Sequence, residues 1–342
     1  MKNDDTALDN IKKKLESIIH KNYLPNDVII STMTVICSIP NIKFECQNIV
    51  KYIDLDNKTI TNAIGVINGV KTNRSYLGKS PKIKSNKEVK TTFLNQISLL
   101  ILSDKKESGK PINMKIFSNG SIQMTGCKSI CDVVDVLHKL ITKLKIVKTK
   151  LDVKNRCMIE IPFVSDRSLL SIDKIKDIKI VMINSNFSVP FRINREKLYN
   201  IARNDDFICV YDSVKHAAVK IKYNCPSNKS TFVSILIFGK GSIIITGANN
   251  CIQIKEGYDF IHKYLLLNIY KIMKVDLKHI INANNVHNAH NINNEHNEQD
   301  NTPDNTNDNM CNKKYLKLNK QSIKQSIKQP FKKNLLLDMI TK

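Results

Sequence analysis

Several features that would point to whole classes of function are missing from this sequence. Nine cysteines are present without a C-x-x-C pair, and no second Cys or His pair completes a zinc site around Cys127 and Cys131. No apolar run approaches the length of a membrane span. No pattern of a nucleophile beside a base stands out. We therefore expect no metal, no cofactor, no small-molecule substrate, no membrane contact and no enzymatic activity.

A nucleotide site and a secretory route are also disfavoured. Gly78, Lys79 and Ser80 match the end of the phosphate-loop pattern G-x-x-x-x-G-K-S, but Asn73 stands where that pattern needs its first glycine. The chain starts with polar residues and shows no secretory signal. Its cysteines are odd in number and irregularly spaced, which is typical of reduced thiols. These features predict an intracellular protein.

Positive charge is the first feature that the sequence has in excess. It contains 54 Lys and Arg against 31 Asp and Glu, a formal net charge of +23. Such an excess attracts polyanions and speeds encounter with them, without specifying a fold. Nucleic acid is the polyanion that we expect, and an anionic membrane surface is the rival. The abundance of Lys, Asn and Ile also suits an AT-rich genome, so codon usage explains part of the charge.

One short stretch occurs twice. Residues 116–126 read IFSNGSIQMTG and residues 237–247 read IFGKGSIIITG, so seven of eleven positions are identical at an offset of 121 residues. Each copy has two apolar, alternating runs around a glycine-containing turn, which predicts a β-hairpin. An amphipathic helix is predicted after each hairpin. A folded unit is therefore expected twice in this chain.

Other segments follow the same order around both hairpins: a strand, a helix, several antiparallel strands and a final helix. A composition break after the second unit, rich in Asn and poor in large apolar residues, predicts disorder. The predicted divisions are an N-terminal helical appendage (1–24), a first repeat (25–149) with a basic loop (71–90), a connector (150–177), a second repeat (178–281), an Asn-rich linker (282–312) and a basic tail (313–342).

The two faces of each hairpin are predicted to differ, because side chains alternate along a strand. The amphipathic helix must cover one face, and the other face then remains open. That open face is expected to be mildly apolar and nearly uncharged, and it could form a dimer interface, a ligand wall or a nucleic-acid surface. The residues expected on it are Phe117, Gln123, Thr125, Phe238, Ile244 and Thr246.

The duplicated pattern I-F-x-x-G-x-I-x-x-T-G, each time before an amphipathic helix, resembles the TATA-box-binding protein family. The sequence IISTMTV at 29–35 is similar to the first strand of that family, and 177–192 resembles the entry into its second repeat. The similarity covers about 28–147 and 177–275. It implies an α+β fold in which two pseudo-symmetric repeats form one curved antiparallel sheet, a saddle, with helices on its convex face.

The resemblance also implies a function. Family members are transcription initiation factors whose concave face binds the minor groove and inserts phenylalanines between base steps, which unstacks the steps and bends the duplex. The minor groove distinguishes little beyond A·T from G·C. Carried over residue by residue, the inserting positions are Phe117 with Phe93 and Phe238 with His216. The groove contacts are Gln123, Thr125, Ile244 and Thr246.

Two departures from the family pattern leave an alternative open. His216 stands where the family has a phenylalanine, and the central asparagines of the family align with Val28 and with Ile180 or Met182. These differences favour a TBP-fold module that binds protein or another nucleic acid without TATA specificity.

The implied partners are double-stranded A·T-rich promoter DNA, a transcription factor IIB-like factor and RNA polymerase. The AT-biased composition fits a large DNA virus or an AT-rich parasite. The expected location is then the nucleus or, for a viral protein, the cytoplasmic replication site or the virion.

Overall fold

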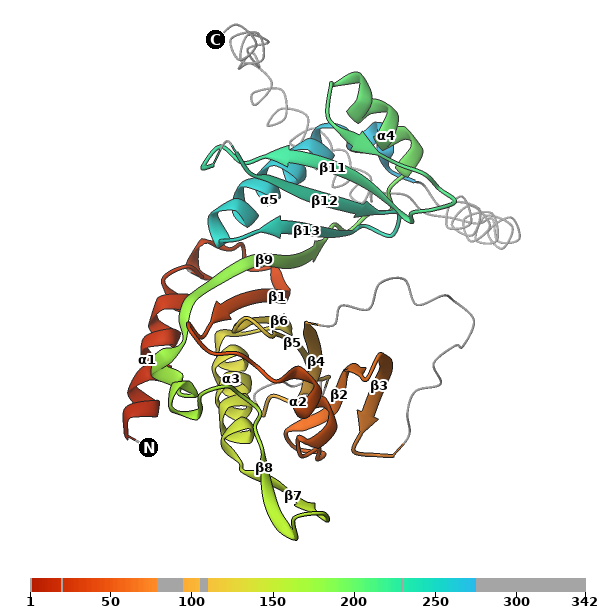
Figure 1. Ribbon diagram of the computed structural model, residues 1–342. Coiled ribbons are helices and arrows are strands. Elements are labelled where there is room, and N and C mark those ends of the chain that lie inside the picture. Colours follow the sequence, from red (N-terminus) through yellow and green to blue (C-terminus); the bar gives the residue numbers. More distant parts are fainter. Residues whose placement is uncertain (1, 20, 79–94, 105–109, 229, 275–342) are drawn as a thin grey trace, which may run out of the picture. The chain divides into compact units, whose positions relative to one another are not determined.

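The two hairpins found in the sequence become matching parts of one antiparallel sheet in the computed structural model (Figure 1). The structure describes residues 2–19, 21–78, 95–104, 110–228 and 230–274. Phe93, most of the basic loop, the Asn-rich linker and the basic tail lie outside these ranges.

Eleven strands form this open sheet, and every pairing in it is antiparallel. Figure 1 shows the strand direction turning gradually from β11 to β2, which is the twist expected of a large sheet. The order across the sheet is β10 (Cys209–Val210), β11 (Ala218–Asn224), β12 (Phe232–Phe238), β13 (Ser242–Ala248), β9 (Lys176–Ser188), β1 (Ile29–Ser38), β6 (Ser121–Cys127), β5 (Ile112–Phe117), β4 (Gln96–Ile101), β2 (Ile60–Ile67) and β3 (Val70–Ser75).

A pseudo-two-fold axis passes between the central strands β1 and β9. Met33 pairs with Ile183, its equivalent 150 positions later. The two flanking pairs, Thr32 with Asn184 and Thr34 with Met182, are also equivalent to each other under this offset of 150 positions. The neighbouring hairpins β5–β6 and β12–β13 occupy equivalent places on the two sides. The predicted fold class, with two pseudo-symmetric repeats in one open antiparallel sheet, is confirmed.

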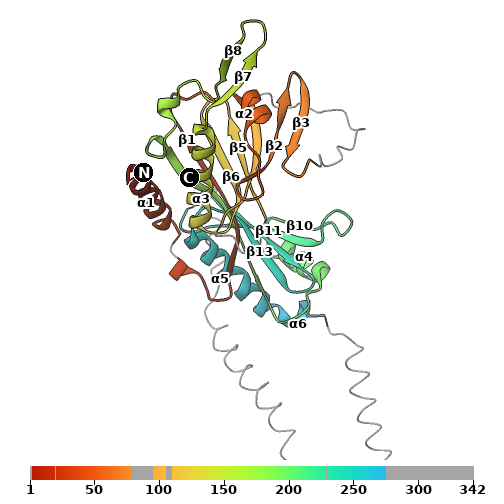
Figure 2. The ribbon, with the colours of Figure 1, turned by 90° about the horizontal axis from the view of Figure 1, so that it is seen from below.

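Helices cover one face of the sheet, and α3 and α5 lie along the same side of it (Figure 2). Both begin with reciprocal caps: Asp132 Oδ2 accepts the backbone N–H groups of 128 and 129, and Gln253 Oε1 accepts that of Asn249. The helices are α2 (Cys46–Tyr52), α3 (Ile130–Lys145), α4 (Arg195–Asn204), α5 (Cys251–Leu267) and α6 (Ile269–Ile272).

The shared glycines of the two hairpins have a backbone reason. Gly120 has φ of 90° and Gly241 has φ of 93°. A Cβ atom on Gly120 would lie 2.4 Å from the carbonyl oxygen of Ile39, and one on Gly241 would lie 2.5 Å from that of Val189. Only glycine fits a turn with both a positive φ and so close a neighbouring carbonyl.

Three segments differ from the sequence predictions. Helix α1 (Lys2–Glu16) is more than an appendage, since Ile11 and Leu15 are buried in the common core. The start of the basic loop forms edge strand β3, paired with β2. The connector contains a hairpin of β7 (Lys148–Asp152) and β8 (Cys157–Ile161), which the sequence did not predict. Three short 3₁₀ turns complete the elements: Lys21–Tyr23, Arg167–Leu169 and Ile172–Lys174.

Candidate nucleic-acid interface

The sheet face that the helices leave uncovered, called here the open face, follows directly from strand alternation. On β5, Met114 and Ile116 are fully buried on the helix side, whereas Lys115 and Phe117 are only half-buried on the other side. The remaining strands of the two hairpins alternate in the same way. The open-face positions of the hairpins and their neighbours are Gln96, Ser98, Leu100, Asn113, Lys115, Phe117, Ser121, Gln123, Thr125, Ala218, Lys220, Lys222, Phe232, Ser234, Leu236, Phe238, Ser242, Ile244 and Thr246.

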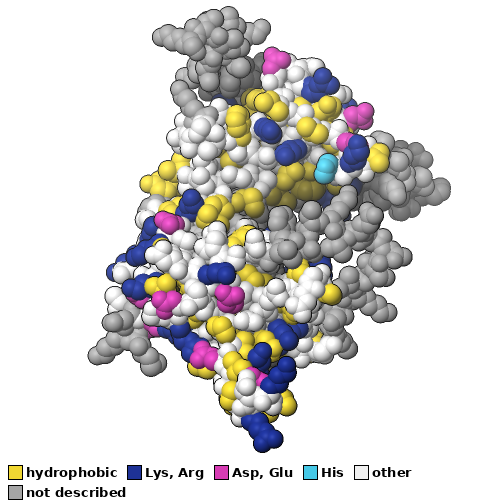
Figure 3. Space-filling view, in the orientation of Figure 1, with side chains coloured by type: hydrophobic (Ala, Val, Ile, Leu, Met, Phe, Trp, Pro, Cys, Tyr) yellow, Lys and Arg dark blue, Asp and Glu magenta, His cyan; other side chains and the backbone are white. Residues whose placement is uncertain are grey.

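No Asp or Glu occurs at these open-face positions. The charged side chains on the face are the lysines 115, 179, 220 and 222, and at the start of β9 Asp177 Oδ2 accepts a hydrogen bond from Ser38, which pairs with the open-face residue Ser121. Other carboxylates pair with lysines elsewhere, as in Asp56 with Lys143 of α3. Figure 3 shows basic side chains over both halves of the face in view, together with acidic ones. A sheet face on which cations outnumber anions suits a polyanionic ligand.

Phe117 and Phe238 occupy equivalent places on the open face. Phe117 pairs across the strands with Gln96, and Phe238 pairs with Ala218. Both phenylalanines are half-buried, and among the described residues neither belongs to the apolar side chains packed against the buried core. His216, two residues before Ala218, is exposed, and its backbone N–H donates to the carbonyl of residue 212 at 2.8 Å.

The predicted groove contacts also lie on the open face. Gln123, Thr125, Ile244 and Thr246 are all half-buried. The register makes Thr125 and Thr246 equivalent, because Thr125 pairs with Asn113 as Thr246 pairs with Ser234. The structure therefore brings all four side chains to one face and divides them equally between the two halves.

Asn184 is an open-face residue that the sequence alignment missed. Its side-chain amide donates to Thr32 Oγ1 at 2.9 Å, and its Oδ1 accepts from Thr246 Oγ1 at 2.5 Å. The resemblance aligns the family asparagine with Ile180 or Met182, but the amide lies at Asn184, two residues after Met182 on the same face of β9. The equivalent position in the first half is Thr34, which has no amide.

The identical positions of the two hairpins are explained by different physical causes. Buried isoleucines fill the core at 116 and 122 and again at 237 and 243, and the shared glycines answer backbone requirements. Neither reason applies to the open-face phenylalanines and threonines, whose side chains point away from the buried core. Their repetition indicates that the open face has a use of its own.

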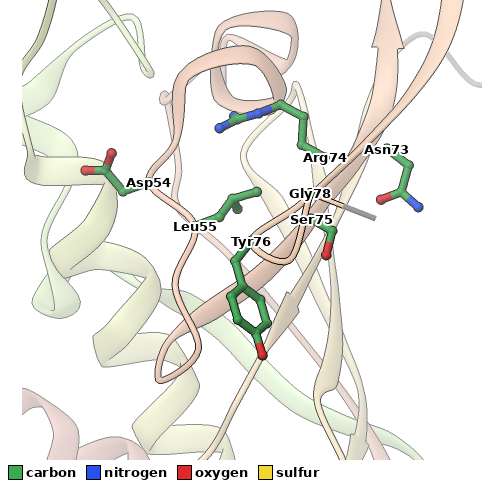
Figure 4. Close-up of a pocket in the computed structure, with 7 residues that line it drawn as sticks. All are labelled: Asp54, Leu55, Asn73, Arg74, Ser75, Tyr76 and Gly78. Atoms are coloured by element: carbon green, nitrogen blue, oxygen red, sulfur yellow. The ribbon is translucent and has the colours of Figure 1, made fainter. Parts of the chain in front are cut away.

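A hollow lies at the edge of the sheet, beside strand β3. This hollow of about 490 Å³ is lined by Asp54, Leu55, Asn73, Arg74, Ser75, Tyr76 and Gly78 (Figure 4). Arg74 donates to the carbonyl oxygens of Val50 at 2.8 Å and of Ile53 at 3.2 Å, so it completes the C-terminal end of α2. Burial lowers the pKa of Arg74. Its guanidinium is thus committed to the fold, and the hollow offers a ligand little charge.

Within the described ranges, no three His, Cys, Asp or Glu side chains come together as a possible metal site. None of the helices in those ranges is both long enough and apolar enough to cross a bilayer.

Comparison with known proteins gives a close relative. The chain is 35% identical over 276 residues to a "TATA-box-binding protein-like" protein of Acanthamoeba polyphaga mimivirus, an alignment covering 76% of this chain and 71% of that protein. Among solved structures, TBP of Methanococcus jannaschii matches with a TM-score of 0.40 and 17% identity, covering 69% of this chain and 95% of the other. No protein-family model matches the chain.

Proposed function

The chain belongs to the TATA-box-binding protein-like family, and from this premise we propose that it is a transcription initiation factor that binds and bends A·T-rich promoter DNA in the minor groove. The observation that carries the proposal is the open face, where Phe117 and Phe238 occupy pseudo-symmetric places on a surface whose charged side chains are mainly lysines. The protein acts by binding, without turnover of a substrate.

The physical argument joins charge and shape. Lysines on and around the open face neutralise phosphates and release counterions, which supplies affinity without sequence preference. Phe117 and Phe238 then enter base steps at the two ends of the site, as the family does, and the kinked duplex contacts more of the sheet. Unstacking costs least at flexible T-A steps, which favours A·T-rich sequence.

Two further parts of the proposal follow from family membership. The protein bound to promoter DNA provides a platform for a transcription factor IIB-like factor and RNA polymerase. It acts inside the cell, in the nucleus or at a cytoplasmic replication site, or is carried in a virion. The mimivirus relative supports the viral setting.

The decisive test is bending of a doubly end-labelled A·T-rich duplex, followed by fluorescence energy transfer at moderate salt against a G·C-rich duplex. Phe117→Ala/Phe238→Ala should lose the bend, and affinity for the A·T-rich duplex should fall at least tenfold. Tyr270→Ala is the matched control, because Tyr270 is an aromatic residue on helix α6, outside the open face, and is 70% exposed. The control should bend DNA like the unaltered protein.

A different outcome would favour the alternative. Equal binding to both duplexes without a bend, unchanged in the double variant, would mean that only the net charge acts on DNA. The protein would then be a TBP-fold module for another protein or nucleic acid, a role that the exposed histidine at 216 favours.

A further inference from the structure

One cross-strand pair differs in chemistry between the two halves although its place in the sheet is the same. In the first half, Lys115 on β5 faces Gln123 on β6. In the second half, Leu236 on β12 faces Ile244 on β13. Each pair lies next to its phenylalanine along the open face, between Phe117 or Phe238 and the cross-strand pair that contains the repeated threonine.

The second-half pair offers a base only hydrocarbon. In the minor groove, A·T pairs present acceptors alone, whereas a G·C pair adds the protruding N2 amino group of guanine as a donor. Leu236 and Ile244 would remove water from that amino group and supply no acceptor in exchange. Burial of an unpaired donor is costly, so this half should reject G·C.

The first-half pair offers hydrogen-bonding groups of both kinds. The ammonium of Lys115 can donate to the groove acceptors of any base pair, and the Gln123 amide can both donate and accept. The Gln123 amide nitrogen lies 3.5 Å from Thr125 Oγ1, which directs that amide along the open face. Among the described residues, no carboxylate forms an ion pair with Lys115.

A neighbouring acceptor strengthens this reading. Asn113, two residues before Lys115 and on the same face, has a side-chain oxygen that is buried and accepts no hydrogen bond within the described part of the chain. Its equivalent in the second half is Ser234. The first half therefore holds two amide oxygens where the second half holds a leucine–isoleucine pair and one hydroxyl.

We propose that the two halves read DNA by different rules: the first half accepts a G·C pair beneath Lys115 and Gln123, whereas the second half requires A·T beneath Leu236 and Ile244. The inference rests on the proposed minor-groove function. Its consequence is a preferred orientation, because a site with G·C in one half can be bound well in only one direction.

The test uses four duplexes that share flanks and differ only inside the site: all A·T, G·C in one half, G·C in both halves, and inosine·cytosine in both halves. Inosine lacks the N2 amino group, so it isolates the group that the inference invokes. Affinity and bending are measured for each. Energy transfer to one DNA end from a dye on the exposed Cys157, in a background with Cys131 and Cys311 replaced by serine, reports the orientation.

The unaltered protein should bind the all-A·T and half-G·C duplexes within about twofold of each other. It should bind the duplex with G·C in both halves about tenfold more weakly, the usual effect of one unfavourable base pair. Inosine should restore the affinity, and the half-G·C duplex should be bound in one orientation.

Two reciprocal variants make the assignment specific. Lys115→Leu/Gln123→Ile gives the first half the chemistry of the second and should lose about tenfold on the half-G·C duplex. Leu236→Lys/Ile244→Gln should tolerate G·C in both halves. All four positions are half-buried on the open face, so the substitutions should leave the core intact. Bending of the all-A·T duplex verifies that each variant is folded.

Failure of the inference and failure of the proposed function are distinguishable. If no duplex is bent, the minor-groove function itself is wrong. If the all-A·T duplex is bent but one G·C half already weakens the unaltered protein tenfold, or the variants leave the pattern unchanged, the inference alone is overturned.

Discussion

The two halves of the sheet share a scaffold and differ on the surface that the scaffold presents. Backbone pairing around the axis is equivalent over the central strands, and each hairpin places a glycine against the carbonyl of the residue that follows a central strand, Ile39 after β1 or Val189 after β9. On the open face, however, Lys115 and Gln123 in one half correspond to Leu236 and Ile244 in the other. Constraints from packing and backbone have kept the halves alike, and the surface has been free to diverge.

The halves also differ in the polar contact that the helix after each hairpin makes with a neighbouring loop. In the first half, Lys143 of α3 donates to Asp56, just before β2, at 2.7 Å. In the second half, Tyr264 of α5 donates to Asp205, between α4 and β10, at 2.7 Å. The same position in the fold is therefore held by an ion pair in one half and by a phenol–carboxylate hydrogen bond in the other.

The largest loss of stability should come from substituting the hairpin glycine that both halves share. Gly120→Ala and Gly241→Ala should each lower the free energy of unfolding by about 3 kcal/mol, since both combine a positive φ with a close backbone carbonyl. Urea denaturation would measure this loss. Gly69→Ala is the control: its φ is also positive, at 79°, but nothing lies within 4 Å of the added Cβ. A loss at Gly69 as large as at the hairpin glycines would contradict the steric explanation.

The two helix contacts, Tyr264 with Asp205 and Lys143 with Asp56, should contribute different amounts to the free energy of unfolding. Tyr264→Phe leaves Asp205 without its phenol donor and should cost about 2 kcal/mol. Burial raises the pKa of Tyr264, so the neutral phenol persists and this cost should be constant from about pH 5 to pH 9.

Asp56→Asn should cost less, about 0.5–1 kcal/mol, because this pair is partly exposed to solvent. Burial opposes ionisation of Asp56, but hydrogen bonds from Lys143 and Thr59 hold its pKa well below the ordinary value of 3.8. A lowered pKa stabilises the fold above that ordinary value, and the benefit disappears as pH falls below it. The difference between the unaltered protein and Asp56→Asn should therefore shrink below about pH 4 in urea titrations, and a constant difference would exclude the ionised carboxylate as its cause.

The equivalent threonines of the two halves should also differ in how much stability their hydroxyl groups contribute. Thr246→Val removes the donor to Asn184 Oδ1 and should cost about 1 kcal/mol of unfolding free energy. Thr125→Val affects only a 3.5 Å contact with Gln123 and should cost about 0.5 kcal/mol or less. Thermal unfolding followed by circular dichroism would compare them, and equal losses would mean that the network around Asn184 adds no stability.

The sequence was sufficient for the repeat, the hairpins and the faces of their strands, because period-two alternation and the shared glycines are local signals. It also placed Phe117 and Phe238 on the open face. It did not identify Asn184, because Met182 and Asn184 lie two residues apart on the same face of β9, and period-two alternation cannot decide between them.

Two other features, the β7–β8 hairpin and the burial of helix α1, could not be predicted from the sequence, for different reasons. The β7–β8 hairpin exposes both of its faces, as the neighbouring residues Met158 and Ile159 show, so it has no alternation to detect. Helix α1 is polar overall, and the burial of Leu15 depends on packing against α3, far along the chain. In both segments the deciding information is tertiary.

The seam between β1 and β9 has a consequence for how the chain folds. Its backbone pairs join residues 138 to 157 positions apart, so the seam can close only after the whole first repeat, the connector and strand β9 have been synthesised. Contacts of such long range form slowly, and until then the first repeat presents β1 as an unpaired edge to other chains. During synthesis the first half therefore passes through a period in which β1 can pair wrongly with another chain. This period ends when β9 pairs with β1.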